Sequence, residues 1–184
     1  AKGRLQYELR EAEMPTTFSR SFCVQSVGST CRDRVDNYVA SQVDNEEFVD
    51  PRFARRMEAF TVEDRQVDLS APVHTRRGRY LYALHLVLVT CDRSRFTSRE
   101  RLGRMRDLAL AVARKKEHRL SRLSVMPDHM HLSIGAPPSQ SPQDVALAYM
   151  NNLAHGLGLS RPWQPSYYVG SFGDYDMGAL WQNL

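Results

Sequence analysis

Residues 119–134 read RLSRLSVMPDHMHLSI. Apolar residues alternate with other residues on both sides of Pro127-Asp128. This pattern predicts two strands, at 119–126 and 129–134, joined by a turn. Side chains alternate along a strand, so His129 and His131 should share one face while the apolar residues between them face the core. Two neutral imidazoles on one face suit a divalent metal ion. The stretch predicts a metal site on a sheet, although two surface histidines that share a face by chance would give the same pattern.

The flanking sequence supplies the rest of a small sheet. The nearly continuous apolar run at 79–90, RYLYALHLVLVT, indicates a central strand. Helical periodicity predicts helices over 98–117 and from Ser141 to about Gly158, and residues 166–172 predict a last strand. The order β-α-β-β-α-β is typical of an α+β, ferredoxin-like or RRM-like fold. Such a fold places both helices on one face of an antiparallel sheet and leaves the other face for a ligand.

The first part of the chain is less regular. We expect residues 1–19 to be a loosely packed leader, followed by a short strand at 21–27 and a helix over 31–42. Residues 43–79 are polar and charged, so they predict a connector with one short helix near 52–60. The chain therefore divides into residues 1–78, an N-terminal strand-helix unit with its connector, and residues 79–184, a catalytic core, within one functional domain.

Composition limits the class of protein. The chain has 184 residues, of which 42% are hydrophobic and 25% charged, which is typical of one globular domain and excludes a disordered chain. No apolar run approaches the roughly 20 residues that span a bilayer, and the N-terminal residues lack the apolar stretch of a secretory signal. We therefore expect no membrane partner and a cytoplasmic protein. The three cysteines lack the spacing of a zinc or redox site.

Basic residues concentrate in 93–122, where eleven of them face three acidic ones. Most are arginines, whose guanidinium groups bind phosphate in a bidentate way. The region predicts contacts with nucleic acid, although a solvated helix face in an arginine-rich proteome would look the same. The candidate DNA-binding residues are Arg93, Arg95, Arg99, Arg114, Lys115, Lys116, Arg119 and Arg122.

The segment RLSVMPDHMHLSI, on an inner strand of this β-α-β-β-α-β pattern, resembles the His-hydrophobic-His motif of single-tyrosine HUH transposases, including the REP-associated tyrosine transposases. The resemblance covers roughly residues 79–175. It implies that His129 and His131 hold Mg²⁺ or Mn²⁺ and that a tyrosine on a separate helix attacks single-stranded DNA. The implied substrate is the hairpin end of a mobile or repetitive element.

The chain departs from that family in the position of the tyrosine. The family's last strand leads into a helix with Tyr-x-x-x-Gln, whereas here SYYVGSFG continues as DYDMGALWQNL. Near the N-terminus, SFCVQSVGSTCRDRVDNYVASQ has the form of the missing strand, turn and helix, with Tyr38 and Gln42 one helical turn apart. We interpret this as a circularly rearranged order. The resemblance then implies Tyr38 as the nucleophile and Gln42 as a further metal ligand.

Several alternatives remain open. Tyr38 with Val35 and Val39 would also fit an ordinary amphipathic core stripe, and Tyr175 is a rival nucleophile. Asp128 fits a metal ligand, a hydrogen-bond partner of a histidine, or a simple Pro-Asp turn. The remaining histidines show no comparable pairing and are expected to be structural or surface residues: His74, His85, His118 and His155.

Two other functions compete with strand transfer. A metal-dependent phosphodiesterase would use His129, His131 and Asp128 with water as the nucleophile, and a non-catalytic RRM-like module would only bind nucleic acid. The transposase interpretation also implies a homodimer, because two strand exchanges need two active sites. The apolar strand at 80–89 is the segment we expect to pair across its two-fold axis.

Overall fold

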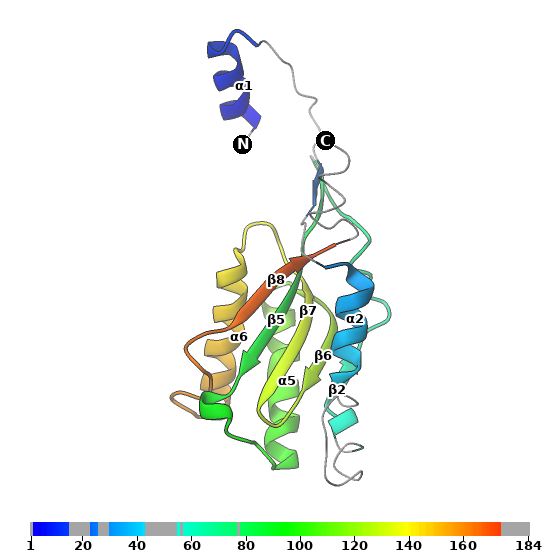
Figure 1. The fold of residues 1–184 in the computed structure, drawn as a ribbon, viewed down its shortest axis with the longest axis vertical. Coiled ribbons are helices and arrows are strands. Elements are labelled where there is room, and N and C mark those ends of the chain that lie inside the picture. Colours follow the sequence, from blue (N-terminus) through cyan, green and yellow to red (C-terminus); the bar gives the residue numbers. More distant parts are fainter. Residues whose placement is uncertain are drawn as a thin grey trace.

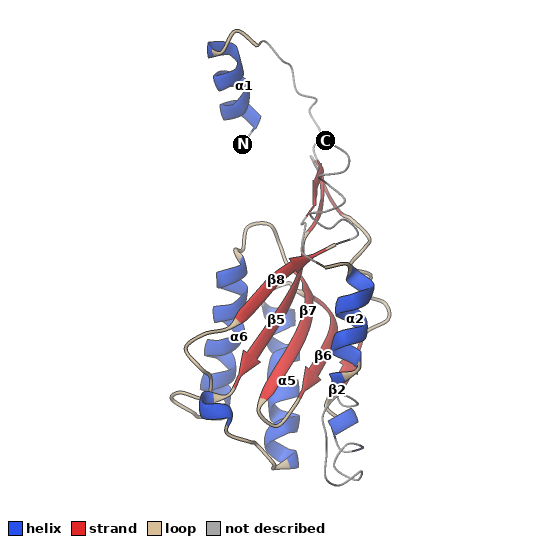
Figure 2. Cartoon of the chain, viewed as in Figure 1, coloured by secondary structure: helices blue, strands red, loops and turns tan. Residues whose placement is uncertain are grey.

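The computed structural model describes residues 2–14, 23–25, 30–42, 55, 57–76 and 78–173. Its helices are α1 (Lys2–Glu11), α2 (Arg32–Ala40), α5 (Arg99–Lys115) and α6 (Pro142–Leu157), with a 3-10 turn, η1 (Cys91–Arg93). Its strands are β1 (Cys23–Gln25), β2 (Thr61–Glu63), β3 (Val73–Thr75), β4 (Gly78–Leu81), β5 (Ala83–Val89), β6 (Arg119–Val125), β7 (His129–Gly135) and β8 (Tyr168–Phe172). Figure 2 shows these elements in place.

The main sheet has five strands in the order β2-β6-β7-β5-β8, and every neighbouring pair is antiparallel. Its last four strands with α5 and α6 give the β-α-β-β-α-β order, so the sequence-based fold prediction is confirmed (Figure 1). β7 lies in the middle, where Val87 of β5 pairs with His131 and Ser124 of β6 pairs with it from the other side. The histidine strand is therefore held on both edges.

One face of the sheet is apolar and is covered by α5 and α6. The inward residues of β5 and β7 pack with these helices in one core, which contains Leu84, Leu86, Leu88, Met130, Leu132 and Ile134. Local signals fix both helices: Ser98 accepts a hydrogen bond at the start of α5, and Ser141 and Asp144 form a capping box before Pro142. α6 ends at Gly158, whose left-handed φ of 67° favours glycine.

The opposite face of the sheet carries α2, which packs on β6 and β7 (Figure 1). Val35 and Val39, one turn apart on α2, are buried with Ala83 and Phe172. Ion pairs also hold the same helix, since Arg32 contacts Asp68 at 2.8 Å and Asp36 lies 3.8 Å from Arg122. The helix that carries Tyr38 is thus docked on the sheet by both apolar and charged contacts.

The structure adds three elements to the sequence-based description of the N-terminal part: α1, β2 and β3. Residues 2–11, expected as a loose leader, form α1, which contains an Arg4–Glu8 ion pair at the helical i, i+4 spacing. The expected connector contributes β2, an edge strand on β6, and β3, a strand on β4. Of the predicted helix at 52–60, the described residues include helical positions at 55 and 57–58. The other positions of that prediction lie largely outside the described residues.

The predicted single strand at 79–90 is two strands in two sheets. β4 belongs to a three-stranded sheet with β1 and β3, and β5 belongs to the main sheet. Both strands have neighbours on each edge, so neither can pair across a two-fold axis as we expected. A dimer of this chain must use another surface. Among the described residues, we find no helix with the length and apolar character needed to cross a membrane.

Candidate active site on the histidine face

The sheet face under α2, called here the histidine face, carries three buried imidazoles. His129 and His131 alternate along β7 with core residues, as the sequence predicts, and their ring centroids lie 5.0 Å apart. The third ring is that of His85 on β5, whose neighbours Leu84 and Leu86 point into the opposite core. The expectation that His85 has no comparable pairing is wrong, because strand alternation and the β5–β7 pairing bring it into this group, and its burial shows that it is not a surface residue.

The Nδ1 atom of His129 is fixed by a carboxylate. Asp128 Oδ1 lies 2.7 Å from this nitrogen, and its Oδ2 lies 3.3 Å from Arg93. Because a carboxylate accepts hydrogen bonds, His129 donates from Nδ1, and its Nε2 is the nitrogen that remains for another group. Among the three roles left open for Asp128, the structure shows the hydrogen-bond partner. Arg93 itself lies in η1 with a φ of 51°, a strained left-handed conformation for a non-glycine residue.

The Nδ1 atom of His131 is fixed by His85, whose Nε2 lies 3.1 Å away. The two rings are nearly parallel, with an interplanar angle of 17°. No described residue hydrogen-bonds Nε2 of His129 or of His131. Each of the two β7 histidines therefore has one nitrogen held by a neighbour and one left for another group.

Burial keeps two of these imidazoles neutral. It lowers the pKa of His85 to about 4. Burial, together with the nearby rings of His129 and His85, lowers the pKa of His131 to about 3. A buried cation without a counter-ion is unfavourable, so both rings lose their protons well below neutral pH. Neutral imidazole is also the form that binds metal ions.

Tyr38 lies directly over this group, on the sheet side of α2. Its ring meets His131 edge to face at a centroid distance of 5.3 Å and meets His85 at 5.8 Å. The side chain is 48% exposed, whereas Val35 and Val39 of the same helix are buried. Tyr38 is therefore not part of a core stripe. Its ring packs against the site and its exposed side is open to a ligand. Tyr175, the rival nucleophile, lies outside the described residues.

Gln42 follows Tyr38 by one turn and is buried. Its Nε2 donates to the main-chain oxygen of Tyr38 at 2.6 Å, which leaves its Oε1 as the atom that can bind another group. Among the described residues, no three side chains of histidine, cysteine, aspartate or glutamate gather into a metal cage. Imidazole nitrogens and an amide oxygen are donor types that bind divalent ions, so His129, His131 and Gln42 are the candidate ligands of an open site.

The candidate DNA-binding residues fall into separate groups. Arg93, Arg95 and Arg99 precede or begin α5, and Arg93 contacts Asp128, whereas Arg114, Lys115 and Lys116 end the helix. A helix of 17 residues places these groups about 25 Å apart. Arg119 binds the main-chain oxygen of Asp68, and Arg122 pairs with Glu63 and Asp36 beneath α2. The structure does not bring the eight residues into one patch.

Comparison with known proteins identifies the family. A family model described as "Transposase IS200 like" matches residues 79–182, more than half of the chain. The chain belongs to the IS200-like transposase family. The ISDra2 transposase TnpA of Deinococcus radiodurans is 27% identical to the chain over 112 residues, which cover 53% of this chain and 80% of that protein.

Two solved structures resemble parts of this transposase. One, a candidate transposase from Deinococcus radiodurans R1, has a TM-score of 0.48 and 26% identity, covering 53% of this chain and 84% of its own. The other is a REP-associated tyrosine transposase bound to a REP hairpin, with a TM-score of 0.42 and 17% identity, covering 55% of this chain and 61% of its own.

The residues that match the family model include only part of the candidate active site of this transposase. His85, Asp128, His129 and His131 lie within the matched residues, and Tyr38 and Gln42 of α2 precede them. Sequence reasoning found the β7 histidines from their alternation but missed His85, the one polar residue in an apolar strand. It named Arg93 as a DNA-binding residue and did not foresee its contact with Asp128. The position of His85 between Leu84 and Leu86 could have revealed it. Side chains alternate along a strand, so His85 must lie on the face opposite to Leu84, Leu86 and Leu88.

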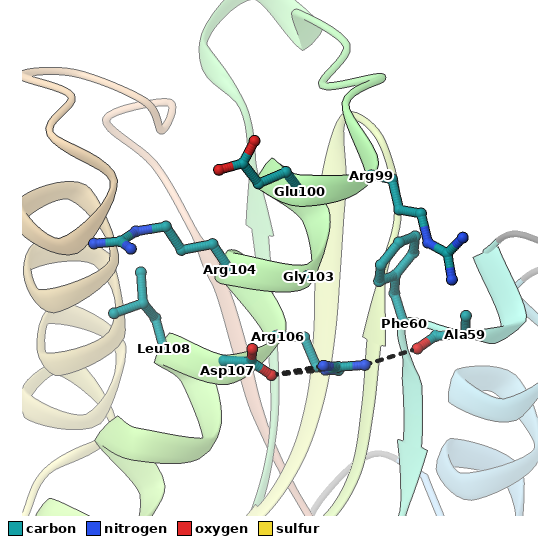
Figure 3. Close-up of a pocket in the computed structure, with 9 residues that line it drawn as sticks. All are labelled: Ala59, Phe60, Arg99, Glu100, Gly103, Arg104, Arg106, Asp107 and Leu108. Atoms are coloured by element: carbon teal, nitrogen blue, oxygen red, sulfur yellow. Dashed lines mark hydrogen bonds and ion pairs between the residues drawn. The ribbon is translucent and has the colours of Figure 1, made fainter.

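The transposase also has a pocket away from the histidine face, on the side of α5 (Figure 3). Its lining includes Phe60, Arg99 and Arg104, but none of the three clustered histidines. Arg106 spans the pocket floor, contacting Asp107 at 2.8 Å and the main-chain oxygen of Ala59 at 3.1 Å. The contact with Ala59 joins α5 to the segment before β2. Because none of the three clustered histidines lines the pocket, we assign the pocket no part in the active site.

Proposed function

We propose that this IS200-like transposase cleaves and rejoins single-stranded DNA through a covalent 5′-phosphotyrosine formed on Tyr38. The observation that carries the proposal is the 5.3 Å contact between the rings of Tyr38 and His131, residues far apart in the sequence. Docking by Val35, Val39 and two ion pairs supports this placement of α2. The partly exposed ring of Tyr38 gives DNA access to its hydroxyl.

The proposed reaction exchanges one phosphodiester for another. Tyr38 Oη attacks the phosphorus, the P–O3′ bond breaks, and the phenolic proton passes to solvent while the 3′ oxygen leaves as a hydroxyl. The products are a 5′-phosphotyrosyl protein and a free 3′-OH. A second 3′-OH reverses the step at the same phosphorus, so joining needs no nucleotide cofactor. The covalent bond conserves the energy of the cleaved phosphodiester.

The proposed cofactor is Mg²⁺ or Mn²⁺, held by His129, His131 and the amide oxygen of Gln42. The chemistry of the donor set supports it: two imidazoles whose Nδ1 atoms are held by hydrogen bonds, and an amide oxygen that makes no hydrogen bond among the described residues. When bound, the ion would polarise the scissile phosphate. Asp128 and Arg93 would keep the His129 ring in one orientation, and α2 would hold the Tyr38 ring over the site.

The proposed substrate is single-stranded DNA at hairpin ends of a mobile or repetitive element, bound by a homodimer. Arg93 contacts Asp128 and is the best placed of the basic residues to contact phosphates beside the site. Because β5 is internal to the sheet, the dimer would form through another surface. Light scattering at micromolar concentration, with and without DNA, tests this: a monomeric mass in both conditions would contradict the dimer.

The direct test of the chemistry is Tyr38→Phe. The protein is incubated with Mn²⁺ and a library of 5′- and 3′-labelled hairpin oligonucleotides, and products are separated on a denaturing gel. The wild type should form a protein–DNA adduct retaining the DNA 3′ to the cut. Tyr38→Phe should retain folding and DNA binding and lose the adduct, because only the hydroxyl is removed.

The matched control is Tyr168→Phe, which removes a hydroxyl from another exposed tyrosine beside His85, at a ring distance of 5.6 Å. It should leave the adduct intact, as should Tyr175→Phe. Loss of the adduct in either control, with Tyr38→Phe still active, would move the nucleophile there. Cleavage without any adduct would instead favour the phosphodiesterase, and binding without cleavage the RRM-like module.

A further inference from the structure

The two histidines of β7 are held by different kinds of partner. His129 faces a carboxylate, and His131 faces another imidazole, that of His85 on the neighbouring strand. The difference matters because a carboxylate fixes the direction of the hydrogen bond, whereas two neutral imidazoles can share one proton in either direction.

Each direction leaves a different atom free on His131. If His85 Nε2 donates, His131 accepts at Nδ1 and carries its proton on Nε2, so the nitrogen away from His85 has no lone pair to offer. If His131 Nδ1 donates, His85 accepts at Nε2, and His131 presents an unprotonated Nε2. Only the second arrangement makes His131 a donor from Nδ1, as His129 is toward Asp128.

We propose that His85 is a positioning residue that accepts the Nδ1 proton of His131 and so keeps the Nε2 lone pair of His131 available to the active site. The inference extends the proposed function, since it assigns the residue that prepares one of the two histidine ligands. No bond to carbon or phosphorus changes: His131 carries its proton on Nδ1 and His85 carries its own on its Nδ1.

The surroundings of His85 support a fixed role. Its ring lies between the rings of Tyr38 and Tyr168, at centroid distances of 5.8 and 5.6 Å, both at steep angles. The small angle of 17° between the His85 and His131 rings is the geometry of a hydrogen bond made within both ring planes. The β5–β7 pairing fixes the spacing of the two backbones. The ring of His85 therefore has little freedom to turn away.

The test reads the tautomer of His131 directly, in metal-free protein at neutral pH. Protonated and unprotonated ring nitrogens of ¹⁵N-labelled histidine have well separated resonances, and His131→Gln assigns the His131 signals. In the wild type we expect a protonated Nδ1 and an unprotonated Nε2. A wild-type His131 protonated on Nε2 would overturn the proposal, whatever the variants do.

Two substitutions test whether His85 determines the tautomer of His131. His85→Leu removes the acceptor, so the His131 ring should become a mixture of tautomers, and Mn²⁺ affinity measured by electron paramagnetic resonance should fall about 10- to 100-fold. His85→Gln can place an amide oxygen near the same point and should restore most of both signals. An unchanged tautomer and an unchanged Mn²⁺ affinity in His85→Leu would contradict the proposal. If that variant does not fold, the wild-type tautomer and His85→Gln decide.

The matched control is His118→Leu. His118 is also a buried histidine with a hydrogen-bonded partner, Tyr149 Oη at 3.2 Å, but it lies outside the histidine cluster. This variant should leave the His131 tautomer and Mn²⁺ affinity unchanged, which separates positioning from loss of stability. Wild-type protein that binds no Mn²⁺ but shows the expected tautomer would refute the proposed metal site and leave the role of His85 intact.

Discussion

The two faces of the main sheet are built from alternate residues of the same strands and have opposite chemistry. The face under α5 and α6 contains leucine, isoleucine and methionine side chains in one core. The histidine face contains buried imidazoles, and two buried serine hydroxyls there, on Ser124 and Ser133, have no hydrogen-bond partner among the described residues. The first face supplies stability, and the second retains polar groups that folding alone would disfavour. We take that difference as the physical mark of a functional face.

The largest difference should appear when neighbouring residues of β5 are truncated. Leu86 is fully buried in the core, and Val87 is half-buried on the histidine face. Leu86→Ala should lower the free energy of unfolding by about 2–5 kcal/mol, because it removes transfer energy and leaves a cavity. Val87→Ala should cost less than half as much. Equal losses in urea denaturation would contradict the division of roles.

Acid should destabilise the protein through the histidine face. Unfolded histidine binds a proton below about pH 6.5, whereas the folded His85 has its pKa lowered by burial to about 4. The unfolded state therefore holds more protons between these values, and stability falls as pH falls. For His85 alone the loss is roughly 3 kcal/mol over that interval.

This pH effect is measured by unfolding metal-free protein in urea at several pH values. His85→Leu should reduce the slope by up to about 1.4 kcal/mol per pH unit between pH 6.5 and 4. A Leu86→Ala protein, which changes only the apolar face, should keep the wild-type slope. The same slope in wild type and His85→Leu would show that His85 is not held neutral by burial.

The smallest effect should come from the unpartnered hydroxyls. Ser124→Ala removes a buried polar atom that makes no hydrogen bond, so stability should be unchanged or rise by up to about 1 kcal/mol. Ser121 of the same strand is the control, because its Oγ donates to the main-chain oxygen of Ser133 at 3.3 Å. Ser121→Ala should lose about 1 kcal/mol. A Ser124→Ala loss as large as the Ser121→Ala loss would indicate a partner for Ser124.

Local sequence patterns determined much of this protein. Alternation in residues 129–134 placed His129 and His131 on one face, and helix caps at Ser98 and Ser141 marked where α5 and α6 begin. These features depend on neighbours within a few residues, because side-chain period and capping are properties of the backbone geometry itself. The family resemblance, based on the motif at residues 122–134, agrees with the family that the chain belongs to.

Only the tertiary structure decided which distant residues meet. The place of His85 depends on the register between β5 and β7, the recruitment of β2 depends on the free edge of β6, and the break at Tyr82 separates two sheets. The contact of Tyr38 with His131 depends on how α2 docks. None of these is encoded in a local period, since strand pairing and helix docking are set by the burial and hydrogen bonding of segments far apart in the chain.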